Sequence, residues 1–309
     1  MQANTAARAD ARPTAGNDEL LGVDEARARI LAAVAGPTAG HPERIALDRA
    51  AGHILAEDLV AGLSMPRWPN AAMDGYALRR ADVGEDPLPI SQRVAAGSMP
   101  PPLAEATAAR IFTGAPVPAG ADTVVMQEHC KAGAAGVCVL RLPEAGANIR
   151  SAGEDYARGD VLLRAGCRLH PQQIALAASA GAAAVAVRPV PRVAVLVTGD
   201  ELAAPGEALG GGQIHESNGH MLAALAGELG AGAEEITRVP DDAGATRRAL
   251  AAAAERADLV ITSGGASVGD GDHVRGAAAD LGELDFFGIA IKPGKPLAFG
   301  RVGGTPLLV

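Results

Sequence analysis

Between residues 190 and 262 the chain alternates strand-like with helix-like segments, and this alternation constrains the fold more than any other feature. The strand-like segments RVAVLVT, EEITRV and DLVIT are separated by ESNGHMLAALAGELGA and AGATRRALAAAAERA. Strands and helices that alternate at this spacing are typical of parallel βαβ units. We therefore predict a parallel α/β domain over residues 190–309.

Acidic residues follow each of the three predicted strands. They are Asp200 and Glu201, Asp241 and Asp242, and, beyond two glycines, Asp270 and Asp272. Because the carboxyl ends of parallel strands share one edge of a sheet, we expect these carboxylates to converge. Carboxylates without basic partners favour a bound cation, and oxygen ligands suit Mg²⁺. The alternative is that each Asp only caps the helix that follows it.

Two loops near the end of the chain have the composition of anion sites. The turn SGGASVG carries Ser263, Gly264, Gly265 and Ser267, and its glycines can expose backbone N–H groups in a concave nest. The loop KPGKP presents two cations between prolines. These are Lys292 and Lys295. Lysines at a turn are also often only solvated, and that interpretation stays open.

The first half of the chain changes composition twice. Residues 23–35 predict an amphipathic helix with Ala26, Ile30, Leu31 and Val34 on its buried face. Residues 61–155 alternate apolar residues with Pro and Gly, which predicts an antiparallel β-rich domain. Helical signals return after it. We predict a disordered tail over 1–19, a helical linker and dimerisation domain over 20–60 and 156–189, and the β-rich domain 61–155 as an insertion.

Composition and charge exclude several classes of function. The net charge is −9, and no basic stripe occurs, so nucleic acid is not an expected partner. No segment reaches the roughly 18 apolar residues that a membrane span needs. The three cysteines have no metal-ligand spacing, which indicates reduced thiols and a cytoplasmic location.

Two further segments carry candidate site residues. PNAAMDGYALR places Asp74 in a turn before a strand, and an Asp-Gly turn is most often only a turn. ANIRSAGEDYARGD carries Arg150, Glu154 and Asp155 in a glycine-bounded loop at a predicted domain junction, where grooves commonly form.

Five groups of residues in this order resemble the molybdopterin molybdenumtransferase family, of the MoeA and gephyrin E-domain type. The resemblance rests on NAAMDGYALR, FTGAPVPAGADTVVMQE, NIRSAGEDYARGD, TGDEL with GQIHESN, and SGGASVGDGDH with IAIKPGKP. It implies a Mg²⁺-dependent enzyme that takes adenylylated molybdopterin and molybdate, hydrolyses the adenylate, and yields molybdenum cofactor and AMP.

The resemblance also implies roles for particular residues. It makes Asp74, Asp155, Asp241 and Asp272 catalytic, and Glu201, Asp241 and Asp272 ligands of the metal. Its substrate-binding set is Thr113, Arg150, Ser263, Gly264, Gly265, Ser267, Lys292 and Lys295. Similar proteins are dimers with residues from both subunits in the active cleft, so a homodimer is expected, with a molybdopterin adenylyltransferase as a possible partner.

The sequence departs from the family pattern in two places. Gly288 stands where some members carry a lysine, which puts one anion contact in doubt. The chain stops at TPLLV, where the pattern continues into a substrate-binding loop and a further β domain, so the sequence reads as truncated at its C-terminus. Two alternatives remain: a molybdopterin adenylyltransferase that uses the α/β domain alone, and a non-enzymatic module that binds molybdopterin.

Overall fold

The computed structural model describes residues 20–35, 40–265 and 273–309. The chain divides into two compact units. Unit 1 joins Met1–His41 to Pro189–Val309, and unit 2 is Pro42–Arg188. Three of the predicted site positions, Ser267, Asp270 and Asp272, lie outside the described residues.

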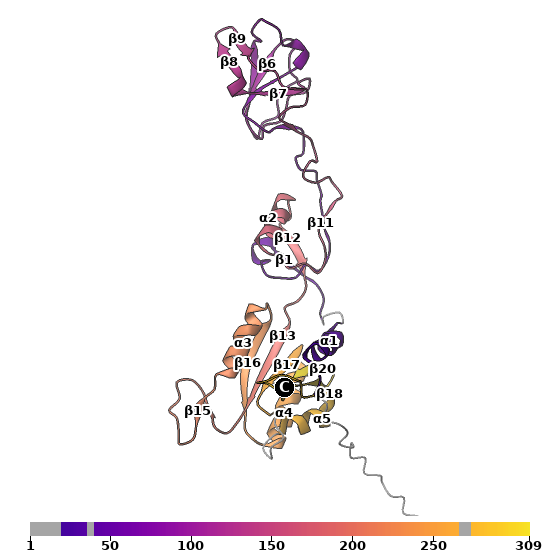
Figure 1. Cartoon of the computed structure of the whole chain (residues 1–309), viewed down its shortest axis with the longest axis vertical. Coiled ribbons are helices and arrows are strands. Elements are labelled where there is room, and N and C mark those ends of the chain that lie inside the picture. Colours follow the sequence, from indigo (N-terminus) through magenta and orange to yellow (C-terminus); the bar gives the residue numbers. More distant parts are fainter. Residues whose placement is uncertain (1–19, 36–39, 266–272) are drawn as a thin grey trace, which may run out of the picture. The chain divides into compact units, whose positions relative to one another are not determined.

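Unit 1 is built on a six-stranded sheet with the order β16-β13-β17-β20-β19-β18 (Figure 1). Its strands are β13 (Arg192–Thr198), β16 (Gly232–Val239), β17 (Leu259–Ser263), β18 (Gly282–Phe287), β19 (Ala298–Val302) and β20 (Thr305–Leu308). β16, β13, β17 and β20 are parallel, whereas β19 is antiparallel to both of its neighbours. The parallel pairing predicted for the first three strands is confirmed.

Helices cover both faces of this sheet (Figure 1). They are α1 (Val23–Val34), α3 (Asn218–Glu228), α4 (Ala243–Arg256) and α5 (His273–Leu281). Alternate residues of β13 point to opposite faces: Ala194 and Leu196 belong to the core under α4 and α5, and Val195 and Val197 to the core under α3. A short parallel pair, β14 (Leu202–Ala203) and β15 (Ile214–His215), lies in the loop between β13 and α3.

The first helix packs within unit 1, although the sequence grouped it with residues 156–189. Ala26 is 3% exposed and shares a core with Phe286, Ile289 and Phe299, on and beside β18 and β19. The two phenylalanine rings lie 6.1 Å apart and form an apolar surface that a helix with a small residue at the contact can cover. The other predicted domain boundaries stay predictions.

The buried face of α1 also differs from the predicted one. Leu31 and Val34, which the sequence placed on the buried face, are 55% and 46% exposed. Ile30 and Ala33 are partly buried against the core instead. The helix begins after Gly22, and no side chain caps it. The periodicity therefore predicted the helix correctly, but not which of its apolar residues meet the sheet.

Unit 2 consists mainly of short strands. They are β1 (Glu43–Ala46), β2 (Leu59–Val60), β3 (Asn70–Ala71), β4 (Gly75–Leu78), β5 (Ile90–Val94), β6 (Ala108–Ile111), β7 (Thr123–Met126), β8 (Cys130–Gly133), β9 (Gly136–Val139), β10 (Ile149–Arg150), β11 (Val161–Leu163) and β12 (Ala184–Val187). One α-helix, α2 (Pro171–Ser179), and three 3₁₀ turns, η1 (Leu47–Arg49), η2 (Arg80–Asp82) and η3 (Gln127–His129), complete its described elements.

The β-rich part of unit 2 contains a four-stranded sheet of order β5-β6-β4-β7. β4 is antiparallel to β6 and β7, but β5 is parallel to β6, so the purely antiparallel prediction is wrong for this pair. The reason is the connection of residues 95–107, which is long enough to carry the chain back before β6 begins. Cores lie against both faces of the sheet.

The flanking part of unit 2 is less helical than predicted. β1 pairs with β12, β2 pairs with β11, and the nine-residue helix α2 packs on a core around Leu55, Leu169 and Val187. Residues 156–189 therefore contain one short helix, and their predicted role in dimerisation stays a prediction. Within the described ranges, no helix has the length and apolar character to cross a membrane.

Candidate functional site

At the carboxyl edge of the parallel sheet, two acidic residues of neighbouring strands meet. The backbone N–H of Asp241 donates to Asp200 Oδ1 at 3.1 Å, and the N–H of Asp200 donates to Asp241 Oδ2 at 3.4 Å. Asp200 follows β13 and Asp241 follows β16, so the parallel pairing of these strands aligns them. The predicted convergence of carboxylates is confirmed for this pair.

The neighbouring Asp242 has a different role. Its Oδ1 accepts the N–H of Ala245 at 2.7 Å, which caps α4. The capping alternative that the sequence left open therefore applies to Asp242, while Asp241 directs its carboxylate to the adjacent loop. Of these two successive aspartates, Asp242 caps a helix and Asp241 lies at the edge of the sheet.

Glu201 lies at the same strand end. An added Cβ on Gly199 would be 2.5 Å from Glu201 Oε2, so the carboxylate folds back over the residue that follows β13. Gly199 has φ +146°, a conformation that side chains rarely adopt. Within the ranges that the structure describes, however, no group of three or more His, Cys, Asp or Glu side chains is arranged to hold a metal ion.

The residues at this edge offer part of a magnesium site. Asp200 and Asp241 supply hard oxygen donors, and each carboxylate has an oxygen that accepts none of the hydrogen bonds above. Neither aspartate forms an ion pair with a described residue. These two side chains are oxygen donors of the kind that Mg²⁺ prefers, and Glu201 and Asp272 stay predicted further ligands.

The Ser-Gly-Gly turn begins at the end of β17. Asn218 Nδ2 donates to Ser263 Oγ at 2.9 Å, so the first residue of α3 holds this turn. Gly264 has φ +94°, and a Cβ there would lie 2.6 Å from Thr198 Oγ1. Gly265 also has a positive φ, of +78°. Two successive residues in this conformation fit the predicted nest of backbone N–H groups, which requires glycine here.

The two predicted lysines lie in the loop between β18 and β19. β20 is parallel to β17, and the antiparallel β19 lies between β20 and β18, so β18 runs in the same direction as β17. The loop after β18 therefore lies at the same edge of the sheet as the acidic residues. A cavity of about 520 Å³ is lined by Leu20 and residues 290–296, which include Lys292 and Lys295. Neither lysine forms an ion pair with a described residue, so both charges are available to an anion.

Gly288, where some family members carry a lysine, has a local backbone that favours glycine. It has φ +90°, and an added Cβ would lie 3.1 Å from Leu20 Cδ2. Its N–H donates to Leu297 O at 2.8 Å, and its carbonyl accepts from Leu21 N. Lysine at this position would need a strained backbone.

In unit 2, Asp74 and Thr113 are in direct contact. Asp74 Oδ1 accepts the Thr113 N–H at 2.7 Å and the Thr113 hydroxyl at 2.8 Å. The backbone bond, followed by the hydroxyl bond and the charge of Arg110, holds the pKa of the Asp74 carboxyl below its usual value, and the loss of hydration opposes this only in part. Asp74 is therefore ionised at neutral pH.

Arg150 joins the two acidic residues of its own loop. Its Nε donates to Glu154 Oε1 at 3.0 Å, and its Nη2 donates to Asp155 Oδ1. The bond to Glu154 and then that to Asp155 raise the pKa of Arg150, and the same contact with Arg150 lowers the pKa of Glu154. Arg150 is also the register partner of Asn70 in the β3–β10 pair. Asn70 comes four residues before Asp74 in the sequence.

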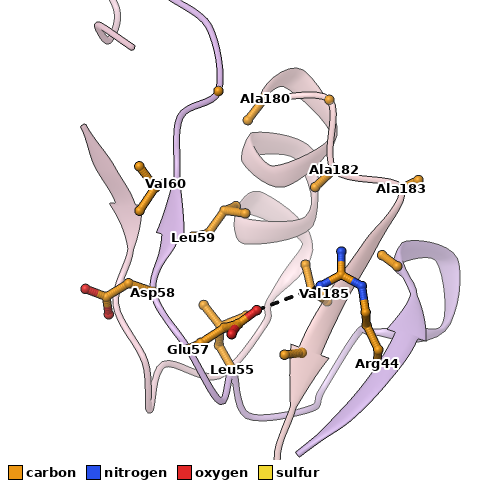
Figure 2. Close-up of a pocket in the computed structure, with 14 residues that line it drawn as sticks. Arg44, Leu55, Glu57, Asp58, Leu59, Val60, Ala180, Ala182, Ala183 and Val185 are labelled. Atoms are coloured by element: carbon orange, nitrogen blue, oxygen red, sulfur yellow. Dashed lines mark ion pairs between the residues drawn. The ribbon is translucent and has the colours of Figure 1, made fainter. Parts of the chain in front are cut away.

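A groove beside the flanking strands of unit 2 is separate from these residues. A cavity of about 400 Å³ lies between β2 and β12 and is lined by Leu55, Leu59, Val185 and the ion pair of Arg44 with Glu57, which is 3.8 Å long (Figure 2). None of the predicted site residues lines it.

The sequence interpretation missed two side chains that support predicted site residues, and a third that accepts a hydrogen bond at the start of a helix beside them. Asn218 holds Ser263, and Glu216, 4% exposed, accepts the Gly219 N–H at 2.6 Å in the first turn of α3. Arg110 contacts the residues around Asp74. The only signal in the sequence was an arginine among apolar residues in the strand ARI, three residues before Thr113.

The fold and these contacts define a protein with an α/β unit of the ligand-binding type and a β-rich unit with its own polar cluster. Comparison with protein families gives a match to "MoeA N-terminal region (domain I and II)" over residues 21–181 and to "Probable molybdopterin binding domain" over residues 194–308. The chain belongs to the MoeA family.

Individual relatives agree with this assignment. A protein of Haemophilus influenzae named molybdopterin molybdenumtransferase is 40% identical over 253 residues, which are 80% of this chain and 62% of that protein. Molybdopterin molybdenumtransferase 2 of Mycobacterium tuberculosis is 41% identical over 81% of this chain and 65% of its own length. The chain thus spans less than two thirds of these relatives.

Solved structures agree as well. The structure described as a molybdopterin biosynthesis MoeA protein of Pyrococcus horikoshii OT3 has a TM-score of 0.79 and 30% identity. The match covers 94% of this chain and 74% of that one.

Proposed function

We propose that this chain takes part in molybdenum insertion into adenylylated molybdopterin, with Mg²⁺-dependent release of AMP. The observation that carries the proposal is the 40% identity, over 80% of the chain, to a relative named molybdopterin molybdenumtransferase. The substrates are adenylylated molybdopterin and molybdate. A cytoplasmic homodimer that receives its pterin from an adenylyltransferase belongs to the same proposal.

The residues of unit 1 suit the handling of a phosphorylated ligand. Asp200 and Asp241, with Glu201 and Asp272, are the proposed holders of Mg²⁺. When bound, the cation would offset the negative charge of the phosphates. Lys292, Lys295 and the N–H groups of the Ser263–Gly265 turn, with Ser267, position the anionic groups of the substrate.

The residues of unit 2 offer ionised and polar groups of their own. Asp74, kept ionised by Thr113, can accept a proton or a hydrogen bond from water or substrate. Arg150 is held by its ion pair with Asp155, which fixes the guanidinium that an anionic group of the substrate would contact. The hydrolysed bond is the phosphoanhydride of the adenylate, which gives AMP as water adds.

Assay of AMP release tests this proposal. The purified chain is incubated with adenylylated molybdopterin, Mg²⁺ and molybdate, and AMP and molybdenum cofactor are quantified by chromatography, with the Haemophilus influenzae relative as a positive control. We expect Mg²⁺-dependent AMP release that chelation abolishes. AMP transfer from ATP to molybdopterin would instead identify an adenylyltransferase, and tight binding without either reaction would identify a binding module; both results contradict the proposal.

A further inference from the structure

The guanidinium of Arg110 connects the ends of three chain segments around Asp74. Its Nη1 donates to Gly75 O at 2.7 Å and to Ile111 O at 3.3 Å, and its Nη2 donates to Gln127 Oε1 at 2.6 Å. Gly75 begins β4, Ile111 ends β6 and Gln127 begins η3 directly after β7. One side chain therefore ties together strands that are far apart in the sequence.

These bonds close a ring around Asp74. The Gln127 N–H donates to Asp74 O at 3.1 Å, so Arg110 and Gln127 hold the two successive carbonyl groups of Asp74 and Gly75. Thr113, three residues after Arg110 on the same chain segment, holds the carboxylate itself. A shift of Arg110 would therefore move the carboxylate and its hydrogen-bond donors relative to each other.

The rings beside Arg110 fix its orientation and leave its charge uncompensated. Its guanidinium carbon lies 5.2 Å from the centroid of Tyr76 and 4.6 Å from that of Phe112. Tyr76 is its register partner on β4. In the described part of the chain, Arg110 forms no ion pair, and its charge contributes to the lowered pKa of Asp74.

Arg93 provides a matched comparison on the neighbouring strand. It is the register partner of Arg110 across the β5–β6 pair, and its guanidinium carbon also lies 4.6 Å from the Phe112 centroid. Its side chain makes no hydrogen bond or ion pair to a described residue. The two arginines therefore contact the same ring, Phe112, and are register partners, but only Arg110 forms hydrogen bonds to the segment after Asp74.

We propose that Arg110 is a positioning residue, which sets the place of the Asp74 carboxylate by joining Gly75 and Gln127. This inference rests on the proposed function only in so far as Asp74 takes part in the reaction. Arg110 itself touches no reacting group in this arrangement, and Lys would retain its charge but not its two-sided hydrogen bonding.

The titration of Asp74 in the whole chain tests the proposal without any substrate. Carboxyl-detected NMR follows Asp74 in the wild type, Arg110→Met and the control Arg93→Met, in which the same apolar length replaces an arginine on the same ring. We expect the pKa of Asp74 to rise in Arg110→Met and to stay at its wild-type value in Arg93→Met. Equal titration curves in the two variants would overturn the proposal.

Arg110→Lys covers the case in which Arg110→Met does not fold. We expect an Asp74 pKa between those of the wild type and the usual range, and about a tenfold fall in kcat for AMP release with little change in KM, because the loss affects the arrangement for reaction and not substrate binding. Wild-type kcat and Asp74 titration in Arg110→Lys would contradict the role. If the wild type releases no AMP, the proposed function fails, and the Asp74 titration still decides the role of Arg110.

Discussion

At the scale of single residues, the predicted site positions differ in how they are held. Asp74 is fixed by Thr113 through two hydrogen bonds from one residue, and Arg150 by two acidic residues of its own loop. Asp241 exchanges hydrogen bonds with the loop of the adjacent strand. Each of these three candidate side chains thus has a supporting partner whose removal has a specific consequence.

The hydroxyl of Thr113 gives a pH-dependent contribution to stability. The folded-state pKa of Asp74 is lowered, so its stabilisation is present above the unfolded-state pKa, about 3.9, and is lost as pH falls through the lower folded-state value. Thr113→Val removes one of the two bonds, so the pKa of Asp74 should rise toward its usual value. The variant should be less stable than the wild type at pH 7, and this difference should shrink as pH falls through the folded-state pKa.

Urea unfolding between about pH 2.5 and pH 7, together with NMR titration of Asp74, measures both effects. Thr107→Val is the matched control, because the Thr107 hydroxyl bonds to Ser91 Oγ and Ala104 O, which do not titrate. Its stability loss should be independent of pH. A pH-independent loss in Thr113→Val would show that the hydroxyl does not act through the Asp74 carboxylate.

Residues with short-range signals could be predicted, and residues with long-range partners could not. The glycines at 264 and 265 were expected because a turn after a strand needs positive φ, and the backbone there has it. Arg110 and Asn218 were missed because their importance depends on contacts 35 and 45 residues away. Nothing in local composition indicates such partners.

At the scale of elements, the ends of the strands decide what each acidic residue does. Asp241 and Asp242 follow the same strand, β16, yet only Asp242 caps α4. The chain turns into the helix at Asp242, which leaves Asp241 one residue earlier at the sheet edge beside Asp200. The division of roles follows from where the helix begins.

This division predicts that two neighbouring substitutions differ in their effect on Mg²⁺ dependence. Asp241→Asn removes one charge from the proposed cation site, and we expect the Mg²⁺ concentration for half-maximal AMP release to rise at least about tenfold, since even indirect supporters of metal ligands cost that much. Asp242→Asn removes an equal charge but keeps a good capping side chain, so Mg²⁺ dependence and stability should stay close to wild type.

Asp242→Ala separates the cap from the charge. It should lower the free energy of unfolding by about 1 kcal/mol through loss of the α4 cap, without a change in Mg²⁺ dependence. Mg²⁺ titration of the assay and urea unfolding measure the two quantities. Unchanged Mg²⁺ dependence in Asp241→Asn would remove Asp241 from the cation site.

Elements with a clear period could be predicted from sequence, whereas pairings could not. The apolar run of β13 and the helical periods of α3 and α4 gave the parallel units that the structure contains. The parallel pairing of β5 with β6 was missed because alternation in a strand indicates a buried face and not the direction of its neighbour. Short pairs such as β14 with β15 are too brief to leave a pattern.

At the scale of the whole molecule, each hydrophobic core lies within one unit. The cores around β13, on both faces of its sheet and under α1, use residues of unit 1 only. The three cores of unit 2 use residues between 45 and 187 only. The sequence could not assign α1 to its unit, because an apolar stripe on a helix shows that it packs but not against which domain.

The separation of the cores predicts that residues 42–188, a continuous segment, fold when expressed alone. This segment contains the single tryptophan, Trp68, and both tyrosines, Tyr76 and Tyr156. Tryptophan fluorescence of the whole chain therefore reports on unit 2, whereas circular dichroism reports on both units. We expect the isolated segment to unfold cooperatively, with the midpoint that Trp68 reports in the whole chain. Circular dichroism of the whole chain should show a further transition from unit 1, because separate cores unfold as separate cooperative units. Coincident fluorescence and dichroism curves in the whole chain, with an unfolded isolated segment, would show instead that the two units depend on each other for stability.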